Sequence, residues 1–381
     1  DNTITKMNPS AGATGPQGNT GATGTQGLPG NDGADGAQGD IGPRGSAGND
    51  GADGAQGPAG ADGTDGAQGP AGAVGTDGAQ GPAGAPGADG AGSRLSDEQI
   101  ALLQWYPGAS VTYPTGDFPV GVAFDGTSIW VANLSSDTVS KINPVNGSRV
   151  EYPTGTSPYG VAFDGTSIWV TNENSNNVSK INPTDGSRVD YPTGATPYGV
   201  AFDGTHIWVA NIGSNNVSKI NPTDGSRVDY PVENAPSEVA FDGTHIWVSN
   251  ADSNSVSKID PTDGTRVDYP TQSRPRQIAF DGTHLWIANE LSDSVSKMDP
   301  ADGTRVDYPS GEDPFGVAFD GSSIWVTNST SDTVSKISRA DGTRVDYPTG
   351  QEPKGIAFDG TSIWIANFRD NTITKMNPSA G

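Results

Sequence analysis

The protein has 381 residues, a net charge of −24, 54 glycines, 29 prolines and no cysteine. The acidic balance disfavours nucleic acids and anionic lipids as partners, because both require clustered lysine and arginine. The absence of cysteine excludes a disulfide framework and thiol chemistry. No apolar run reaches the about 20 residues of a membrane span, so we expect no membrane insertion.

The chain begins with residues 1–11, part of a twelve-residue sequence, DNTITKMNPSAG, that returns at 370–381. This segment leads directly into residues 12–92, where glycine occupies every third position from Gly12 to Gly90, 27 times in succession. Only glycine fits at the axis of three chains wound as polyproline II helices, so the period predicts a collagen-like triple helix. We expect a homotrimer with a rod on the order of 240 Å long. A single chain that packs several such strands against itself is the alternative.

The segment resembles the collagen-like stalks of bacterial and phage surface proteins. This resemblance implies an extracellular or cell-surface location. Residues 93–108 follow as a linker in which Ser96 and Gln99 form a capping-box pattern and Pro107 ends an apolar run. We expect a short neck helix here, which either aligns three chains or caps the next domain.

Residues 109–381 consist of seven units that repeat at a constant interval, marked by Trp130, Trp169, Trp208, Trp247, Trp286, Trp325 and Trp364. Each unit contains alternating segments such as GVAFDG and SIWVAN, expected to be joined by an Asp-Gly hairpin turn, followed by TVSKINP, a Pro-x-Asp-Gly turn and SRVDYP. Four short antiparallel strands without a helix predict one propeller blade. The fold class is therefore all-β, a seven-bladed β-propeller preceded by a collagen-like stalk and a neck helix. We expect the repeated Phe, Trp, Val and Ile positions to form the core.

The last unit lacks a fourth strand, and an additional strand, SVTYPTG at 110–116, precedes the first unit. This strand is expected to complete the last blade and so remove the free sheet edges. The propeller resembles those of the NHL and YVTN type, including virginiamycin B lyase. That resemblance implies the fold alone, because no catalytic motif of the lyase can be placed on this sequence.

The sequence indicates neither an enzyme, a cofactor nor a metal site. His206, His245 and His284 occupy equivalent positions in blades three to five, where the other blades carry serine. Equivalent atoms on neighbouring blades are too far apart to share one zinc ion, so we interpret these histidines as surface variation. The strongest departures from the repeat are the loops 232–238 and 271–277, with Arg274 and Arg276. These loops either line a ligand-binding face or reflect ordinary loop variation.

The duplicated ends predict assembly. Three explanations remain open: a longer head-to-tail series of propellers and stalks, donation of residues 1–9 to the last blade of another protomer, or an artificial duplication. The expected assembly residues are Asp1, Thr3, Ile4, Thr5, Lys6, Met7, Asn8, Val111, Tyr113, Asp370, Thr372, Ile373, Lys375 and Met376.

The resulting hypothesis is an extracellular structural protein that forms a filament or surface appendage from collagen-like rods and propeller beads. Its partner would be another copy of the chain, and no nucleic acid is expected. The alternative is a trimeric stalked adhesin whose propeller binds a glycan or a host receptor.

Overall fold

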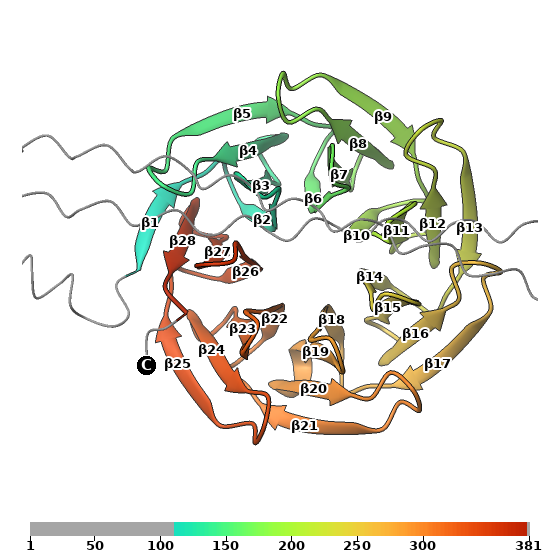
Figure 1. Cartoon of the computed structure of the whole chain (residues 1–381), viewed down its shortest axis with the longest axis vertical. Helices are drawn as coiled ribbons and strands as arrows, with labels where there is room; N and C mark the ends of the chain where they lie inside the picture. Colours follow the sequence, from blue (N-terminus) through green and yellow to red (C-terminus); the bar gives the residue numbers. More distant parts are fainter. Residues whose placement is uncertain (1–109, 379–381) are drawn as a thin grey trace, which may run out of the picture. The chain divides into compact units, whose positions relative to one another are not determined.

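A computed structural model describes residues 110–378 of the protein. These residues form seven four-stranded antiparallel sheets arranged as the blades of a propeller (Figure 1). Blade 1 contains β2 to β5, the following blades each take the next four strands, and blade 7 contains β26, β27, β28 and β1. The expected neck helix at 93–108, the stalk at 12–92 and the assembly residues Asp1 to Asn8 lie outside the described residues.

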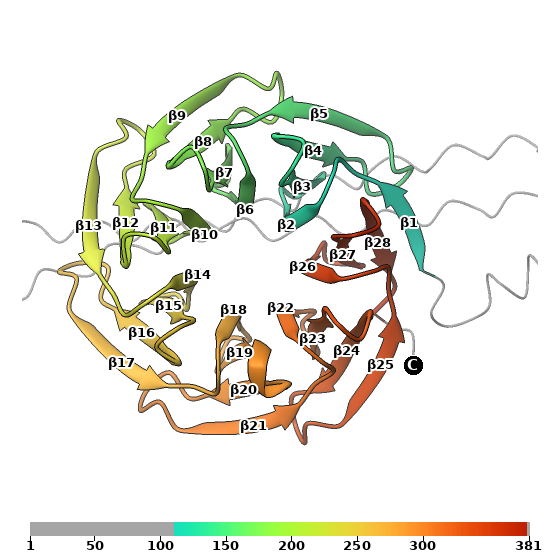
Figure 2. The same cartoon turned by 180° about the vertical axis from the view of Figure 1, so that it is seen from behind.

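Each blade begins with an inner strand near the centre of the ring, as seen from both sides (Figures 1 and 2). The inner strands are β2 (Pro119–Phe124), β6 (Pro158–Phe163), β10 (Pro197–Phe202), β14 (Pro236–Phe241), β18 (Pro275–Phe280), β22 (Pro314–Phe319) and β26 (Pro353–Phe358). The second strands are β3 (Ile129–Asn133), β7 (Ile168–Asn172), β11 (Ile207–Asn211), β15 (Ile246–Asn250), β19 (Leu285–Asn289), β23 (Ser323–Asn328) and β27 (Ile363–Asn367). A short 3-10 helix, η1 (Glu290–Ser292), follows β19.

The third and fourth strands lie progressively farther out, and the fourth strands form the rim (Figure 1). The third strands are β4 (Thr138–Ile142), β8 (Asn177–Ile181), β12 (Asn216–Ile220), β16 (Ser255–Ile259), β20 (Ser294–Met298), β24 (Thr333–Ser338) and β28 (Thr372–Met376). The outer strands are β5 (Arg149–Pro153), β9 (Arg188–Pro192), β13 (Arg227–Pro231), β17 (Arg266–Pro270), β21 (Arg305–Pro309), β25 (Arg344–Pro348) and β1 (Val111–Pro114). In the described part of the chain, no helix has the length and apolar character needed to cross a bilayer.

The core is divided into seven clusters, each between two neighbouring blades. The second strand is buried on both faces, so alternate residues serve opposite neighbours. Trp130 of β3 packs with Ile168 of blade 2, whereas Ile129 packs with Trp364 of blade 7. This arrangement explains why a tryptophan recurs once in every unit, because each one fills the space between its own blade and the next.

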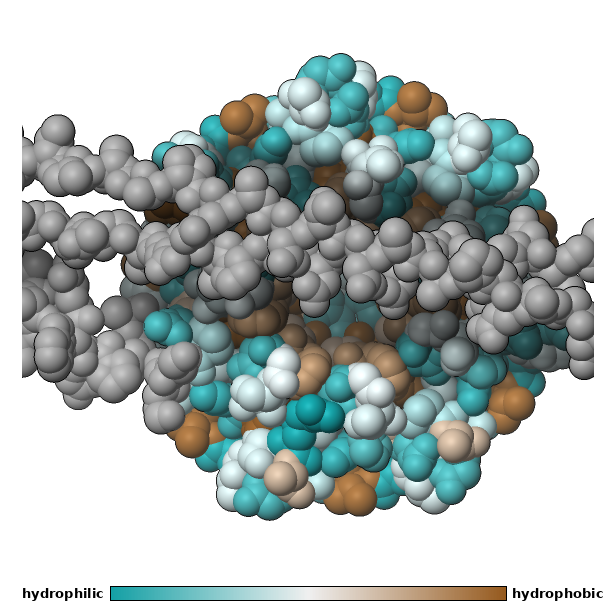
Figure 3. All heavy atoms as spheres, viewed as in Figure 1, coloured by the Kyte–Doolittle hydropathy of each residue, from teal (hydrophilic) through white to brown (hydrophobic). Residues whose placement is uncertain are grey.

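The expected core is wrong for the outer strands. The outer-strand valines are about half exposed, from 48% at Val111 to 55% at Val189, while the tyrosine two positions later stacks on the buried tryptophan. Figure 3 shows isolated brown residues among polar ones around the rim. Successive side chains of an outer strand point to opposite faces, so every second residue, including the valine, points toward solvent. No further layer of the propeller covers that face.

The expected Asp-Gly turn is also wrong in detail. In blade 1 the Asp125 N–H donates to the Ser128 carbonyl at 3.1 Å, so the central residues of the turn are Gly126 and Thr127. Gly126 has a φ of 90°, which favours glycine. The Asp125 carboxylate instead accepts hydrogen bonds from the backbone of Thr127 and Ser128 and from Trp130 Nε1 at 2.7 Å. Burial opposes its ionisation, yet these hydrogen bonds lower the pKa of Asp125.

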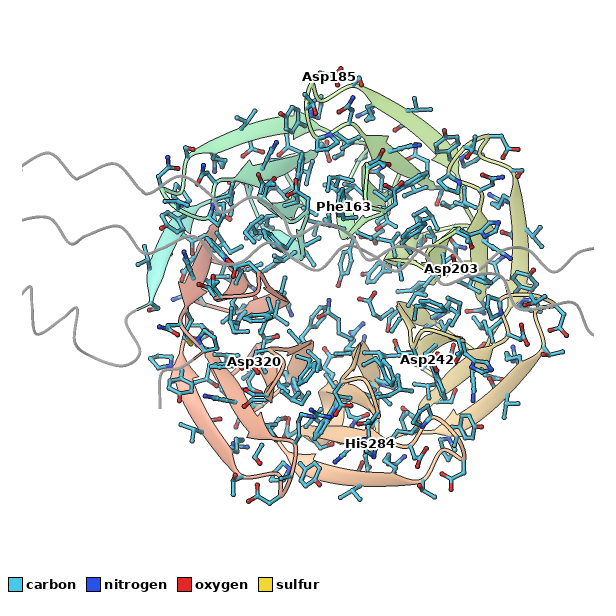
Figure 4. The ribbon with its side chains drawn as sticks, in the orientation of Figure 1. Phe163, Asp185, Asp203, Asp242, His284 and Asp320 are labelled. Carbon is cyan, nitrogen blue, oxygen red and sulfur yellow. The ribbon has the colours of Figure 1, made fainter. Side chains whose placement is uncertain are left out.

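The equivalent aspartates hold the tryptophans of the other six blades in the same way. Figure 4 labels three of them, Asp203, Asp242 and Asp320, in three separate blades. The labelled Asp185 instead lies at the rim, where its side chain accepts from the Ser187 N–H in the turn between β8 and β9. The aspartates of the repeat are therefore accounted for by folding.

Candidate ligand site at the inner ring

Within the inner strands, one position varies more than the others from blade to blade. It is the residue directly after the proline that begins each inner strand. Around the ring it is occupied by Val120, Tyr159, Tyr198, Ser237, Arg276, Phe315 and Lys354. The other positions of the inner strands keep the same residue in at least five of the seven blades, and Figure 4 shows side chains from these strands reaching toward the centre. Variation at one position of otherwise uniform strands points to a place where folding does not dictate the residue.

Five of these variable side chains line a recess on the inner strands of blades 2 to 6. It contains about 200 Å³ of empty space that is open to solvent. Its lining combines aromatic, cationic, acidic and amide groups, which is typical of small-molecule sites. The lining residues are Tyr159, Tyr198, Ser237, Glu238, Arg276, Gln277 and Phe315.

Two tyrosines form one wall of the recess. The rings of Tyr159 and Tyr198 are stacked, with centroids 3.9 Å apart and planes 26° from parallel. Burial raises the pKa of both hydroxyls, so both are neutral at physiological pH. The pair therefore presents aromatic surface together with hydroxyl groups that can donate or accept hydrogen bonds.

Two cations approach the ring of Phe315 from the blades on either side of it. The Arg276 guanidinium of blade 5 lies 5.5 Å from the ring centroid, and Lys354 Nζ of blade 7 lies 4.7 Å from it. Arg276 also pairs with Glu290 at 2.6 Å through Nε, and Lys354 pairs with Glu352 at 3.1 Å. Both side chains are mostly buried, at 12% and 17% exposure, so their charges are held in place.

Glu238 and Gln277 occupy positions that are glycine in the other five blades. Glycine is required there because a Cβ would meet the next blade, as at Gly121, where it would lie 2.2 Å from the Tyr159 carbonyl oxygen. Blade 4 accommodates Glu238 by a changed register, in which Glu238 pairs directly with Ser249. Burial raises the pKa of Glu238 to about 7, against hydrogen bonds from Val239 and Gln277 that favour the charged form.

The histidines of blades three to five do not converge. Each donates or accepts one hydrogen bond with the threonine before it, as in the 2.8 Å contact between Thr205 Oγ1 and His206 Nδ1. The same contact occurs at His245 and at His284, which Figure 4 labels. Among residues 110–378, no three His, Asp or Glu side chains are grouped so that they could hold a metal ion.

The described assembly residues lie in or beside the closing sheet, where β1 pairs antiparallel with β28. The predicted completion of the last blade is therefore confirmed. Val111 is opposite Lys375 and Tyr113 is opposite Ile373. The remaining positions are Thr372 opposite Pro114, Met376 opposite Ile363, and Asp370, whose carboxylate accepts from the Gln351 N–H at 2.7 Å.

The closing contacts reproduce those inside the chain. Lys375 Nζ donates to the Pro144 carbonyl at 2.7 Å, as the equivalent lysines of the other blades do at 2.7–2.9 Å. Tyr113 stacks on Trp364 with centroids 5.9 Å apart, against 5.6–5.8 Å elsewhere. The ring therefore closes with residues of 110–378 alone.

The two divergent loops are only part of the site. The residues that the segments 232–238 and 271–277 contribute lie at the start of inner strands: Ser237 and Glu238 in β14, and Arg276 and Gln277 in β18. Arg274 lies beside the recess, 3.2 Å from the Glu290 carboxylate. Sequence reasoning missed the aromatic residues and Lys354, although comparing the seven units position by position would have revealed them.

These residues define the class of protein: a seven-bladed β-propeller that follows a collagen-like region in the sequence. The model of the collagen triple helix repeat (20 copies) matches residues 8–64 and 36–94. The N-terminal region thus carries collagen triple helix repeats, which imply self-association as a trimer. A comparison with curated proteins finds no match.

The propeller resembles that of virginiamycin B lyase. A streptogramin B lyase structure is 22% identical with a TM-score of 0.63, and the match covers 71% of this chain and 97% of that one. The virginiamycin B lyase of Staphylococcus aureus gives the same identity and score, with coverage of 71% and 99%. A functionally unknown protein from Desulfotomaculum acetoxidans DSM 771 is 15% identical with a TM-score of 0.54, covering 63% and 89%. At these identities the likeness establishes the fold alone.

Proposed function

We propose that the protein is an extracellular structural protein whose collagen-like rods connect propeller beads head to tail. The observation that carries this proposal is the copy of the β28 sequence at residues 1–12, directly before the collagen-like region. The propeller of residues 110–378 already closes with its own β28 and β1. That propeller therefore does not need the copy at residues 1–12. It can serve a preceding propeller of a longer series or replace β28 in another molecule by strand exchange.

The β28 position suits such a joint. Ile373 is fully buried and Met376 is 2% exposed, and Lys375 reaches the neighbouring blade. The corresponding residues of the copy are Ile4, Met7 and Lys6. An identical strand would therefore restore every contact that the resident strand makes.

Electron microscopy of the full chain, with an Ile4→Asp variant, tests this proposal. We expect strings of propeller clusters separated by rods on the order of 240 Å. If the joint forms by strand exchange, Ile4→Asp shortens the strings, because a charge in the buried position prevents pairing. The matched control Asn2→Asp adds the same charge at the equivalent of the partly exposed Asn371 and leaves the strings unchanged. Particles with one propeller cluster and one rod in the wild type would contradict the filament.

A stalked adhesin is the second candidate, and the variable inner ring favours it. A surface that only spaces rods would have no reason to differ between blades, whereas this ring carries a different side chain in nearly every blade. A glycan array probed with the full chain tests this function directly. Retention of defined glycans supports it, and retention of none opposes it.

We propose no catalytic role. Each histidine is engaged with its own blade, and the repeated aspartates hold tryptophans. Incubation with a streptogramin B, the compound class in the name of the similar lyase, should leave that compound unconsumed. Consumption that is lost when His206, His245 and His284 are replaced would contradict a purely structural or adhesive protein.

A further inference from the structure

Among residues 110–378, four of the five cations that do not belong to the repeat pair with two glutamates, Glu290 and Glu352. The seven repeated lysines donate to proline or arginine carbonyls of the next blade, and the six repeated arginines pair with carboxylates of the outer strands. Of the others, Arg339 pairs with Asp281. The remaining four pair with two glutamates: Arg274 and Arg276 with Glu290, and Lys354 and Arg369 with Glu352. Of these, Arg276 and Lys354 also lie against the ring of Phe315.

This grouping stands out against a protein with a net charge of −24. Arg276 and Lys354 lie 5.5 Å and 4.7 Å from the centroid of the same ring and are positioned by Glu290 and Glu352. Arg276 uses Nε for its ion pair, and a guanidinium carries two further amino groups that match the geometry of a carboxylate. Arg276 lines the shallow recess, Lys354 lies beside it at the same phenyl ring, and a fixed guanidinium of this kind favours an anionic group.

The rest of the recess suits a small ring bearing hydroxyl groups. The recess is shallow, and its about 200 Å³ includes space that is open to solvent, so a ligand would lie across it and would not be enclosed. Phe315 and the stacked Tyr159 and Tyr198 offer aromatic surface for the C–H face of a sugar. Glu238 and Gln277 line the same space and can bond hydroxyl groups.

We infer that the inner ring binds a carboxylate-bearing saccharide, with the carboxylate on Arg276, Lys354 as a nearby cation, and the sugar ring against Tyr159, Tyr198 and Phe315. This inference rests on the adhesive function proposed above and names its ligand class. It is independent of trimerisation and of filament length, so its failure would leave the structural function untouched.

The test compares three probes on the full chain by ligand-observed NMR: methyl glucuronide, methyl glucoside and acetate. We expect the glucuronide to bind about tenfold or more tightly than the glucoside, which lacks only the carboxylate, and than acetate, which lacks the ring. Equal affinity for the two sugars would overturn carboxylate recognition, and equal affinity for glucuronide and acetate would overturn saccharide recognition. No binding of the glucuronide at roughly 10 mM would overturn the site.

Charge-removing variants locate the binding. Arg276→Gln should weaken glucuronide binding about tenfold, Lys354→Gln should weaken it by a smaller factor, and both should leave glucoside binding nearly unchanged. The matched control is Arg227→Gln, which removes an equal charge from the outer strand β13, where Arg227 pairs with Asp229 at 3.0 Å. Tryptophan fluorescence during thermal unfolding verifies that each variant is folded. If one of the two variants does not fold, the other still tests the assignment. Unchanged binding in a folded Arg276→Gln or Lys354→Gln protein, or equal loss in the control, would overturn the assignment.

Discussion

Replacing Glu238 by glutamine should make the propeller more stable at neutral and alkaline pH. Burial at the inner ring raises the pKa of this carboxyl from 4.5 to about 7, against hydrogen bonds from Val239 and Gln277. A shift of one pKa unit corresponds to about 1.4 kcal/mol, so the raised pKa of Glu238 corresponds to at most about 3 kcal/mol of folding free energy. Glutamine has the same shape and retains an oxygen for the Val239 N–H, which lies 3.1 Å from Glu238 Oε1.

The direction of the pH dependence follows from where the proton is held. Below pH 4.5 the carboxyl of Glu238 is neutral in the folded and the unfolded chain alike. Between pH 4.5 and about 7 only the folded chain retains the proton, so the stabilising contribution of the neutral form is lost as the pH rises through this interval. The variant should therefore match the wild type near pH 4 and exceed it by up to about 3 kcal/mol near pH 8.

Urea unfolding followed by tryptophan fluorescence measures this difference. Seven of the eight tryptophans are fully buried in the propeller, so the signal reports on the blades. The control Glu312→Gln removes a charge from an exposed position in the loop before β22 and should change the free energy of unfolding by less than about 0.5 kcal/mol. A Glu238→Gln protein that is equally or less stable than the wild type at pH 8 would refute the reasoning.

Three further outcomes are expected. Lys219→Met should lower the free energy of unfolding by about 2–4 kcal/mol, because Lys219 Nζ donates to the Pro261 carbonyl at 2.7 Å and lies 5.4 Å from the Trp208 ring. A loss below about 0.5 kcal/mol in urea unfolding would show that this contact between blades is unimportant. Glucuronide binding, measured by NMR titration, should weaken as the pH rises through about 7, because a charged Glu238 repels the ligand; stronger binding at pH 8 than at pH 6 would contradict this. Deleting residues 1–12 should leave the melting temperature of the propeller unchanged by tryptophan fluorescence, since ring closure does not use them; a clear decrease would place them within the ring.

Much of the fold follows from the sequence because the repeat leaves few alternatives. A repeat of constant length with four β-like segments per unit predicts one blade per unit. The extra strand before the first unit and the missing fourth strand of the last unit predict that β1 pairs with β28 to close the ring. The Asp-Gly turn was misassigned because Asp125 has a second role: it caps the turn and also binds the Trp130 indole. Sequence spacing shows that aspartate and tryptophan recur together, but it does not show that their side chains meet.

The candidate site was only partly predictable for a related reason. Loops 232–238 and 271–277 depart visibly from the repeat, and both contribute to the recess. Tyr159 and Phe315 lie in otherwise regular strands, where an aromatic residue is ordinary in a β-sheet. Their meeting depends on the curvature of the ring, which brings inner strands from separate blades to one centre (Figure 1).

Sedimentation equilibrium of the full chain, combined with circular dichroism, tests the central claim most directly. Collagen triple helix repeats between residues 8 and 94 imply three chains wound together. The smallest species should therefore have a mass of about 117 kDa, three times the 38.9 kDa chain. Its polyproline-type signal should melt cooperatively and separately from the propeller. A species of 38.9 kDa without such a transition would contradict the account.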